Sequence, residues 1–486
     1  MAETLKEKTA KGLFWGGLSN GVQQVIGLIV GVFLARMLTQ SDYGMVGMLT
    51  VFSSLASALQ EGGFISALNR KKDVTDNDYN AVFWTSSLVS LFFYLVLFFC
   101  APLIADFYGI PELKSLARYV FIGFFITSLG IAPKAYLFRN MMVRENAVIS
   151  ISCMLLSGIV GLTMAAYGFA YWGIATQTIV WVSTITILSF YFSKWRPSFR
   201  IDFSPIKEII GYSSKLIITS VFNVININIF PVILGKMYTP HEVGNFTQAK
   251  KWNDMGITFL GGMFSGILQP IFAKTEDDTE RQKRVFRKLL RFTAFIGFPA
   301  MFGLALVSKE FIVILLTEKW LESAQMMQML CIAGAFGLIS GLFCNLIITR
   351  GHSTTYMWCT IISCVIQLAA AIIMAPFGIN RMIQVHVAIN ISWLFVWYYY
   401  SHREINLKLN EVIKDISPYL LLSVTYIAIA YLLTKGITNL YLKFILKVLI
   451  AGIPYILSLW LLKSTIFKEF VLFIRNQITQ RASVTG

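Results

Sequence analysis

Carboxamide side chains stand in the middle of two long apolar segments of this sequence. The first segment carries Asn20, Gln23 and Gln24 near its centre, and a later one carries Asn223 and Asn226. An amide group both donates and accepts hydrogen bonds, so a row of amides can bind the hydroxyl groups of a sugar. Amides within a membrane also join packed helices to one another, which is the alternative interpretation.

The amides of the two segments occupy matching positions. At an offset of 200 residues Asn20 aligns with Ser220, and Gln23 aligns with Asn223. On a helix, Asn20 and Gln23 share a face with Gly27. Contacts between packed helices do not require polar groups at the same depth in both segments. We therefore interpret the amides as the wall of a hydrophilic cavity.

Positively charged side chains also lie within the apolar segments. Lys250 and Asp254 are four residues apart and could neutralise each other on a helix, which leaves Lys251 without a local partner. An ionised group in the bilayer core costs about 2.5–3.5 kcal/mol on insertion scales unless it faces a cavity or a partner. Lys251 and Lys215 are therefore candidates for binding an anionic group. Lys215, near the inner end of its segment, could instead extend to the lipid headgroups.

The other reactive side chains have simpler interpretations. Glu61 is a candidate for proton coupling, with pairing to Arg70 or Lys71 as the alternative. His386 and Asn390 are predicted to satisfy each other rather than to relay protons. The six cysteines lack metal-ligand spacing and are predicted to be small core residues. The predicted substrate-binding residues are Asn20, Gln23, Gln24, Lys215, Asn223, Asn226 and Lys251, and we expect no catalytic residue, metal site or cofactor.

The elements that position these side chains follow from the composition. Of 486 residues, 56% are hydrophobic and 14% are charged, with a net charge of +16 and a mean hydropathy of +0.67. Soluble domains carry nearly twice that charge. The basic residues lie in short loops between apolar stretches, which is the positive-inside pattern of a membrane protein rather than a surface for nucleic acid. No polar stretch is long enough to bury a core of its own.

The apolar stretches predict an all-α, polytopic membrane protein with about fourteen transmembrane helices. Most of the 41 Lys and Arg residues fall in the loops on one side when both termini are placed in the cytoplasm. One helix more or fewer would remove this bias. The expected spans are residues 12–35, 44–68, 80–104, 114–133, 146–167, 170–193, 209–235, 243–271, 289–316, 324–349, 355–377, 380–400, 414–434 and 440–463.

An internal repeat relates two parts of the chain. Residues 34–44 (LARMLTQSDYG) align with residues 234–244 (LGKMYTPHEVG), with four identities and with charge kept at two further positions. A weaker match pairs residues 151–153 with residues 362–364. Six spans separate the copies, so both enter the membrane in the same direction, as in transporters with parallel repeats. We expect two pseudo-symmetric six-helix lobes and two additional C-terminal helices, at residues 1–200, 201–405 and 406–486.

The opening of the chain resembles a known family. The segment GLFWGGLSNGVQQVIGLIVGVFLARMLTQSDYGMVGML, above all Leu34–Leu38 followed by Asp42–Gly44, is similar to the start of polysaccharide transporters of the multidrug/oligosaccharidyl-lipid/polysaccharide flippase superfamily. The resemblance covers roughly residues 8–400 in layout. It implies two lobes around a central cavity in a bacterial plasma membrane. It also implies flipping of a polyprenyl-pyrophosphate-linked oligosaccharide to the outer leaflet for lipopolysaccharide, exopolysaccharide or teichuronic acid assembly.

On that reading, the lysines would bind the pyrophosphate, and the partners are the lipid-linked substrate, membrane lipids and glycan-assembly enzymes. A cation-coupled multidrug extruder of the same superfamily is the first alternative, although it favours an acidic cavity. A membrane-embedded glycan polymerase or ligase is the second. It needs a sizeable outer loop rich in Arg, His or Asp, and the longest outer segment here, about residues 308–323, has no His or Arg. No motif of an enzyme is present in the sequence.

Overall fold

The expectation of an all-helical membrane protein is confirmed by the structure, a computed structural model. It describes residues 5–70, 74–199, 202, 204–273, 275 and 278–469, and these contain helices and no strand. Within the described helices, the side chains of residues 5–14, 16, 18, 56–67, 69–70, 205–219, 263–267, 269–270 and 273 lie outside the description.

Each expected span coincides with one long helix or with one bent pair of helices. Ten of the described helices are long and apolar enough to cross a membrane, and the bent pair α4–α5 makes eleven. Helices α2, α9 and α13 fall outside this set, which was drawn from the described residues alone. The count of fourteen therefore stays a prediction. The helices are α1 (Leu5–Met37), α2 (Gln40–Arg70), α3 (Asp76–Tyr108), α4 (Leu113–Leu129), α5 (Ile131–Arg139), α6 (Val143–Ala166), α7 (Tyr171–Phe192), α8 (Ser204–Met237), α9 (Pro240–Ala273), α10 (Thr279–Leu316), η1 (Glu318–Trp320), α11 (Leu321–Thr349), α12 (Ser353–Met374), η2 (Ala375–Phe377), α13 (Ile379–Ile405), α14 (Leu409–Thr434) and α15 (Leu440–Leu461).

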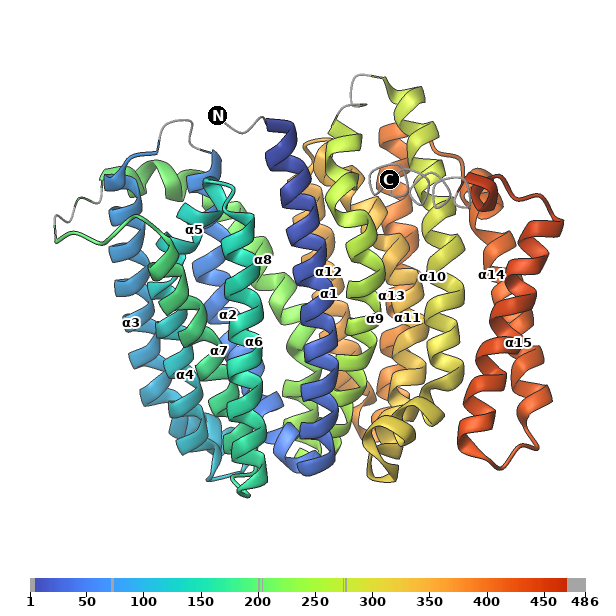
Figure 1. Cartoon of the computed structure of the whole chain (residues 1–486), viewed down its shortest axis with the longest axis horizontal. Coiled ribbons are helices and arrows are strands. Elements are labelled where there is room, and N and C mark those ends of the chain that lie inside the picture. Colours follow the sequence, from blue (N-terminus) through green and yellow to red (C-terminus); the bar gives the residue numbers. More distant parts are fainter. Residues whose placement is uncertain are drawn as a thin grey trace, which may run out of the picture. The chain divides into compact units, whose positions relative to one another are not determined.

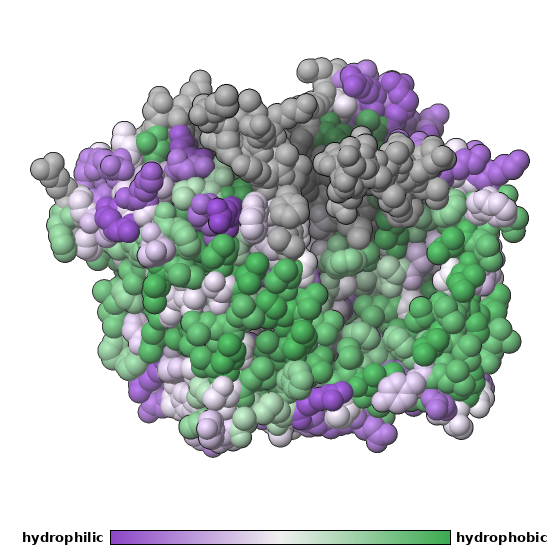
Figure 2. Space-filling model, viewed as in Figure 1, coloured by the Kyte–Doolittle hydropathy of each residue, from purple (hydrophilic) through white to green (hydrophobic). Residues whose placement is uncertain are grey.

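The chain forms two compact units. The first comprises residues 1–247 with 360–368, and the second comprises residues 248–359 with 369–486. Within the first unit, α3, α4, α6 and α7 run along one common direction (Figure 1). On the face drawn in Figure 2, apolar residues occupy the middle of each unit and hydrophilic residues gather at its ends, as a bilayer requires. These units group residues by contact and not by the repeat, so the lobe boundaries at 200 and 405 stay predictions.

The fourth expected span is bent where α4 meets α5. The two helices meet at an angle of 42°, and Gly130 lies at the junction. Pro133 has no N–H for the carbonyl of Leu129, so the helical ladder is interrupted here. A Cβ added at Gly130 would lie 2.9 Å from Thr186 Oγ1 of α7, and that hydroxyl donates to the carbonyl of Ile126 at 3.1 Å. The bend thus allows close packing against α7.

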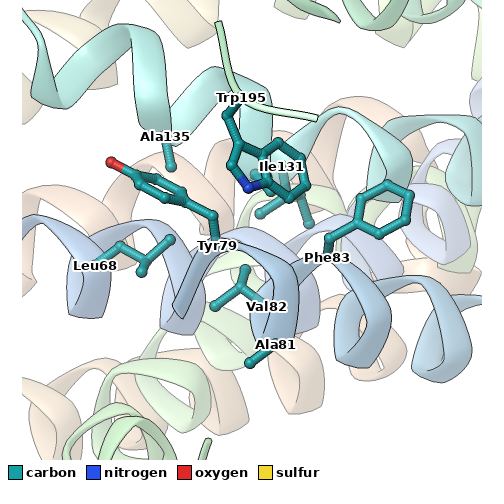
Figure 3. Close-up of a cluster of buried hydrophobic side chains, with 9 residues drawn as sticks. Leu68, Tyr79, Ala81, Val82, Phe83, Ile131, Ala135 and Trp195 are labelled. Atoms are coloured by element: carbon teal, nitrogen blue, oxygen red, sulfur yellow. The ribbon is translucent and has the colours of Figure 1, made fainter. Parts of the chain in front are cut away.

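An aromatic core closes one end of the first unit. The indole of Trp195, which follows α7, lies between Tyr79 and Phe83 of α3 (Figure 3), with ring centroids 6.1 and 5.8 Å away. The core also draws on α2 through Leu68 and on α5 through Ile131. Burying these rings removes a large apolar area from water at the helix ends, where a bilayer gives least cover.

The segment after α7 is fastened along α3 by hydrogen bonds. Trp84 Nε1 donates to the carbonyl of Ser198 at 2.8 Å, and the Ser198 amide donates to Asn80 Oδ1 at 2.9 Å. Farther on, Asn77 donates to Asp202 at 2.9 Å. Hydrogen bonds from Ser204 and from Asn77 lower the pKa of Asp202. The connection to α8 is therefore a defined structure along residues 193–199.

In the second unit, α14 and α15 pack together and against α10, and both are labelled in Figure 1. Lys447 of α15 and Glu310 of α10 form an ion pair at 2.8 Å, and their side chains are only 6% and 2% exposed. Lys447 also donates to the carbonyl of Leu306 at 2.9 Å. Near the N-terminus of α14, Asp415 pairs with Arg287 of α10 at 2.6 Å. The two C-terminal helices expected as an addition are thus bound to this unit by buried charge.

Candidate functional site

The two copies of the repeated motif lie against each other within the first unit. At the 200-residue offset Gln40 aligns with Pro240, and Gly44 aligns with Gly244. A Cβ added at Gly44 would lie 1.8 Å from the carbonyl oxygen of Pro240. A Cβ added at Gly244 would lie 1.8 Å from the carbonyl oxygen of Gln40. The contact is reciprocal, as two copies related by a two-fold axis require.

The N-termini of α2 and α9, the helices that begin within the two copies of the motif, have the same side-chain contacts. In the first copy, the backbone N–H and the hydroxyl of Thr39 donate to Asp42 Oδ2 at 2.8 and 2.6 Å. In the second copy, the N–H of Thr239 donates to Glu242 Oε2 at 2.9 Å, and its hydroxyl donates to the same oxygen. In the first copy the Asp42 N–H also donates to the Thr39 hydroxyl at 3.2 Å, which completes a capping box. The threonine and the acidic residue of the motif thus set the start of α2 and α9.

The helix ends next to the two motifs are also closely packed. Gly235 of α8 leaves room for Tyr108 and Met48, because an added Cβ would lie 2.7 Å from Tyr108 Cε1 and 2.9 Å from Met48 Cγ. The Tyr108 hydroxyl donates to the carbonyl of Met48 at 3.3 Å. A Cβ at Gly47 would lie 2.7 Å from Thr247 Oγ1. This close-packed region, predicted to be the outer end of the helices, leaves no space for a solute between them.

The amides of α1 have unequal surroundings. Asn20 is exposed, whereas Gln23 and Gln24 are half-buried. Gln23 donates to the hydroxyl of Ser19 at 2.9 Å. A Cβ at Gly27 would lie 2.7 Å from a Met154 atom of α6. The face expected to line a cavity is therefore packed against α6 at Gly27 and accessible at Asn20.

In α8 the amides also remain accessible in part. Asn223 and Asn226 are half-buried, and Asn226 Oδ1 is buried without a hydrogen-bond partner among the described residues. Asn228, which is also half-buried, donates to the carbonyl of Val224 at 3.0 Å. The side chains of Lys215 and Glu61 lie outside the described part. The assignment of all these residues to substrate or coupling stays a prediction.

The charged group of α9 has the expected local pairing. Lys250 and Asp254 form an ion pair one helical turn apart. Lys251 is exposed, its ammonium lies 5.9 Å from the centroid of the Trp252 ring, and within the described part of the chain it forms no ion pair. Asn253 Oδ1 is buried and without a hydrogen-bond partner there. An accessible ammonium at this depth is able to bind an anion.

The predicted pairing of His386 with Asn390 is present in the second unit. Asn390 Nδ2 lies 3.1 Å from His386 Nε2 and donates to the carbonyl of His386 at 2.9 Å. All six cysteines are free thiols. Among the described residues no group of three metal-ligating side chains occurs.

A largely apolar recess with several hydroxyl groups, which was not expected from the sequence, lies within the first unit. It has a volume of about 460 Å³ between α2, α4, α7 and α8, within the range typical of ligand pockets. Five hydroxyl side chains and one indole line it together with apolar groups. The only signal in the sequence is the run of small hydroxyls in α2, and such residues are common in membrane helices.

Comparisons with known proteins point in one direction. Residues 33–325 match the model of a family described as "Polysaccharide biosynthesis protein". The chain is 24% identical over 337 residues, 68% of either chain, to "Lipopolysaccharide biosynthesis protein WzxC" of Escherichia coli (strain K12).

Solved structures share the fold. One, titled "Lipid II flippase MurJ, inward closed conformation", matches 96% of this chain and 100% of its own with a TM-score of 0.73 and 16% identity. Another is an inward-facing multidrug resistance MATE family transporter of the MOP superfamily. It matches 79% of this chain and 94% of its own with a TM-score of 0.63 and 16% identity.

Proposed function

The chain belongs to the polysaccharide biosynthesis protein family, and we propose that it flips a polyprenyl-pyrophosphate-linked oligosaccharide from the cytoplasmic to the outer leaflet of the plasma membrane. Membership confirms the resemblance to polysaccharide transporters that residues 34–44 indicated. The shared fold confirms an all-helical, multi-span membrane protein.

The observation that carries the proposal is the reciprocal contact of the two motif copies. Gly44 touches the backbone at the start of the second copy, and Gly244 touches the backbone at the start of the first. Two like-oriented lobes that alternate access to a site between them share an axis along the membrane normal. A contact of this symmetry supports such lobes, which we place at residues 1–200 and 201–405, with both termini in the cytoplasm.

The accessible polar groups suit the two parts of such a substrate. The amides of α1 and α8, such as Asn20 and Asn223, offer donors and acceptors to glycan hydroxyls. The Lys251 ammonium offers positive charge to the pyrophosphate, since it forms no ion pair within the described residues. An exporter of cationic drugs would need unpaired carboxylates instead. The glycan-assembly enzymes that supply and consume the substrate are further proposed partners.

The experiment is complementation in a strain that lacks the gene, with surface polysaccharide and membrane expression measured together. We expect Lys251→Met and Asn223→Ala to abolish the polysaccharide at normal expression. Lys251→Arg keeps the charge and should retain it. Asn228→Ala removes another half-buried amide of α8 that is not among the predicted substrate-binding residues, so it is the control for Asn223→Ala.

A direct assay completes the test. Purified protein in vesicles should move a polyprenyl-pyrophosphate-linked saccharide from one leaflet to the other, and Lys251→Met should stop this movement. Wild-type polysaccharide in both loss variants would reject the site residues. Failure of the wild-type protein to move any lipid-linked saccharide, with export of organic cations instead, would reject the function.

A further inference from the structure

Among the residues that the structure describes, the recess within the first unit is lined by apolar side chains, five hydroxyls and one indole, and by no charged residue. Four helices form it, and all of its lining residues lie between 46 and 224. Trp181, at the midpoint of α7, is 44% exposed. The polar lining residues are Thr50, Ser53, Ser54, Thr127, Thr178 and Trp181.

The threonines of the recess present acceptor oxygens to its interior. Thr50 donates its hydroxyl proton to the carbonyl of Gly47 at 2.7 Å. Thr127 donates to the carbonyl of Gly123 at 2.8 Å, and Thr178 donates to its own helix in the same way. Because each proton is used within a helix, the lone pairs of these oxygens remain available. A ligand that brings hydroxyl donors would satisfy them.

Ser53 provides a second, independent indication of a ligand. Its Oγ is buried and has no hydrogen-bond partner among the described residues. Leaving a buried hydroxyl unsatisfied costs free energy, so native structures usually pair such groups with protein, water or ligand. An acyl chain in the recess would leave Ser53 unpaired.

The chemistry of the lining selects a class of ligand. A pyrophosphate would need a cation and an organic cation would need a carboxylate, and the lining residues that the structure describes carry neither. An uncharged sugar ring has hydroxyl groups at its edge and apolar C–H groups on its faces. The hydroxyls match the acceptors of Thr50, Thr127 and Thr178, and the faces match the exposed indole of Trp181.

We propose that this recess binds an uncharged sugar residue of the transported glycan, with its ring stacked on Trp181 and its hydroxyls bound by Ser53 and the three threonines. The proposal rests on the proposed function and makes it specific, because it separates recognition of the sugar from recognition of the pyrophosphate. Trp181 and Ser53 are then residues that determine which sugars the protein accepts.

The test compares the binding of three probes to the purified protein in nanodiscs. The probes are polyprenyl pyrophosphate alone, the same lipid linked to glucose, and the same lipid linked to glucuronate. We expect glucose to strengthen binding over the bare lipid by roughly tenfold, which corresponds to about 1.4 kcal/mol. Glucuronate should give a smaller gain, because its carboxylate would enter a recess whose described lining offers no cation.

Variants of the lining residues test whether the gain in affinity from glucose arises in the recess. Trp181→Ala and Ser53→Ala should each reduce the glucose-dependent gain several-fold, with the affinity for the bare lipid unchanged. Trp181→Phe should retain most of it. Thr178→Val should reduce it and Thr184→Val should not, because Thr184 makes the same bond within α7 but does not line the recess.

The possible results distinguish a failure of the sugar-site proposal from a failure of the proposed flippase function. If glucose strengthens binding equally in all variants, the recess is not the sugar site, and the flippase function stands. If the bare lipid and the sugar-linked lipids bind the wild-type protein equally, the proposal of a sugar subsite is overturned. Ser53→Ala removes an unsatisfied group, so it should fold at least as well as the wild type and keeps the test informative if Trp181→Ala does not fold.

Discussion

Replacing Gly44 with alanine should separate the two copies of the repeated motif. The added Cβ would lie 1.8 Å from the carbonyl oxygen of Pro240, whereas an unstrained contact needs about 3.5 Å. The two helix starts must therefore move apart by roughly 1.7 Å. Because the obstacle is backbone, no side-chain rotation can relieve it. Overpacking of this kind typically costs about 1–3 kcal/mol, which shifts a two-state equilibrium by roughly 5–150-fold.

A disulfide reports on the separation directly. We introduce Gly47→Cys and Thr247→Cys into a protein freed of its six native cysteines. A Cβ at Gly47 would lie 3.7 Å from Thr247 Cβ, which suits a disulfide. This pair should oxidise rapidly, and Gly44→Ala should slow the oxidation by about tenfold, for a cost of about 1.4 kcal/mol.

The repeat supplies its own controls. Gly244→Ala should have the same effect as Gly44→Ala, because its Cβ meets the Gln40 carbonyl at the same distance. The double variant should add little, since the first substitution has already parted the helices. Gly337→Ala and Gly341→Ala add a Cβ in open space and should leave oxidation unchanged. Oxidation of Gly44→Ala at the wild-type rate would refute the reciprocal contact.

Three further predictions concern other contacts. Glu310→Gln leaves Lys447 buried without a counter-charge and should lower the unfolding free energy by about 3–5 kcal/mol, measured by thermal unfolding in detergent, whereas Glu310→Leu with Lys447→Met should recover most of it. Thr39→Ala removes a capping box and should cost about 1 kcal/mol in the same assay, and an unchanged midpoint would contradict the cap. Trp84→Phe loses a hydrogen bond worth about 0.5–1.5 kcal/mol and should speed trypsin cleavage in residues 193–199, while equal cleavage would contradict the fastening of that segment.

Local patterns in the sequence predicted local contacts. The ion pair of Lys250 with Asp254 followed from a spacing of one helical turn, and the structure contains it. The spans followed from apolar length, since a bilayer imposes that length on any helix that crosses it. The repeat at residues 34–44 and 234–244 followed from direct alignment. Its two copies proved to lie in contact, which alignment alone does not imply.

Contacts between distant residues could not be predicted. Nothing in the sequence pairs Lys447 with Glu310, which lies 137 residues away, and only packing of α15 on α10 brings the two together. The recess of the first unit draws its hydroxyls from separate helices, and each hydroxyl-bearing residue by itself is ordinary in a membrane helix. Such sites depend on helix rotation and packing, which hydropathy does not encode.

The meeting of the two motifs also explains which of their residues can differ. The receiving group on each side is a backbone carbonyl, which every amino acid carries, so the side chain at that position is free to vary. Gln40 and Pro240 do differ, and both helices begin normally. The glycine position of each motif, Gly44 or Gly244, has no such freedom, because any side chain larger than hydrogen would push the partner helix away. If the two motifs arose by an old gene duplication, Gly44 and Gly244 would be expected to persist while most of the residues around them diverged.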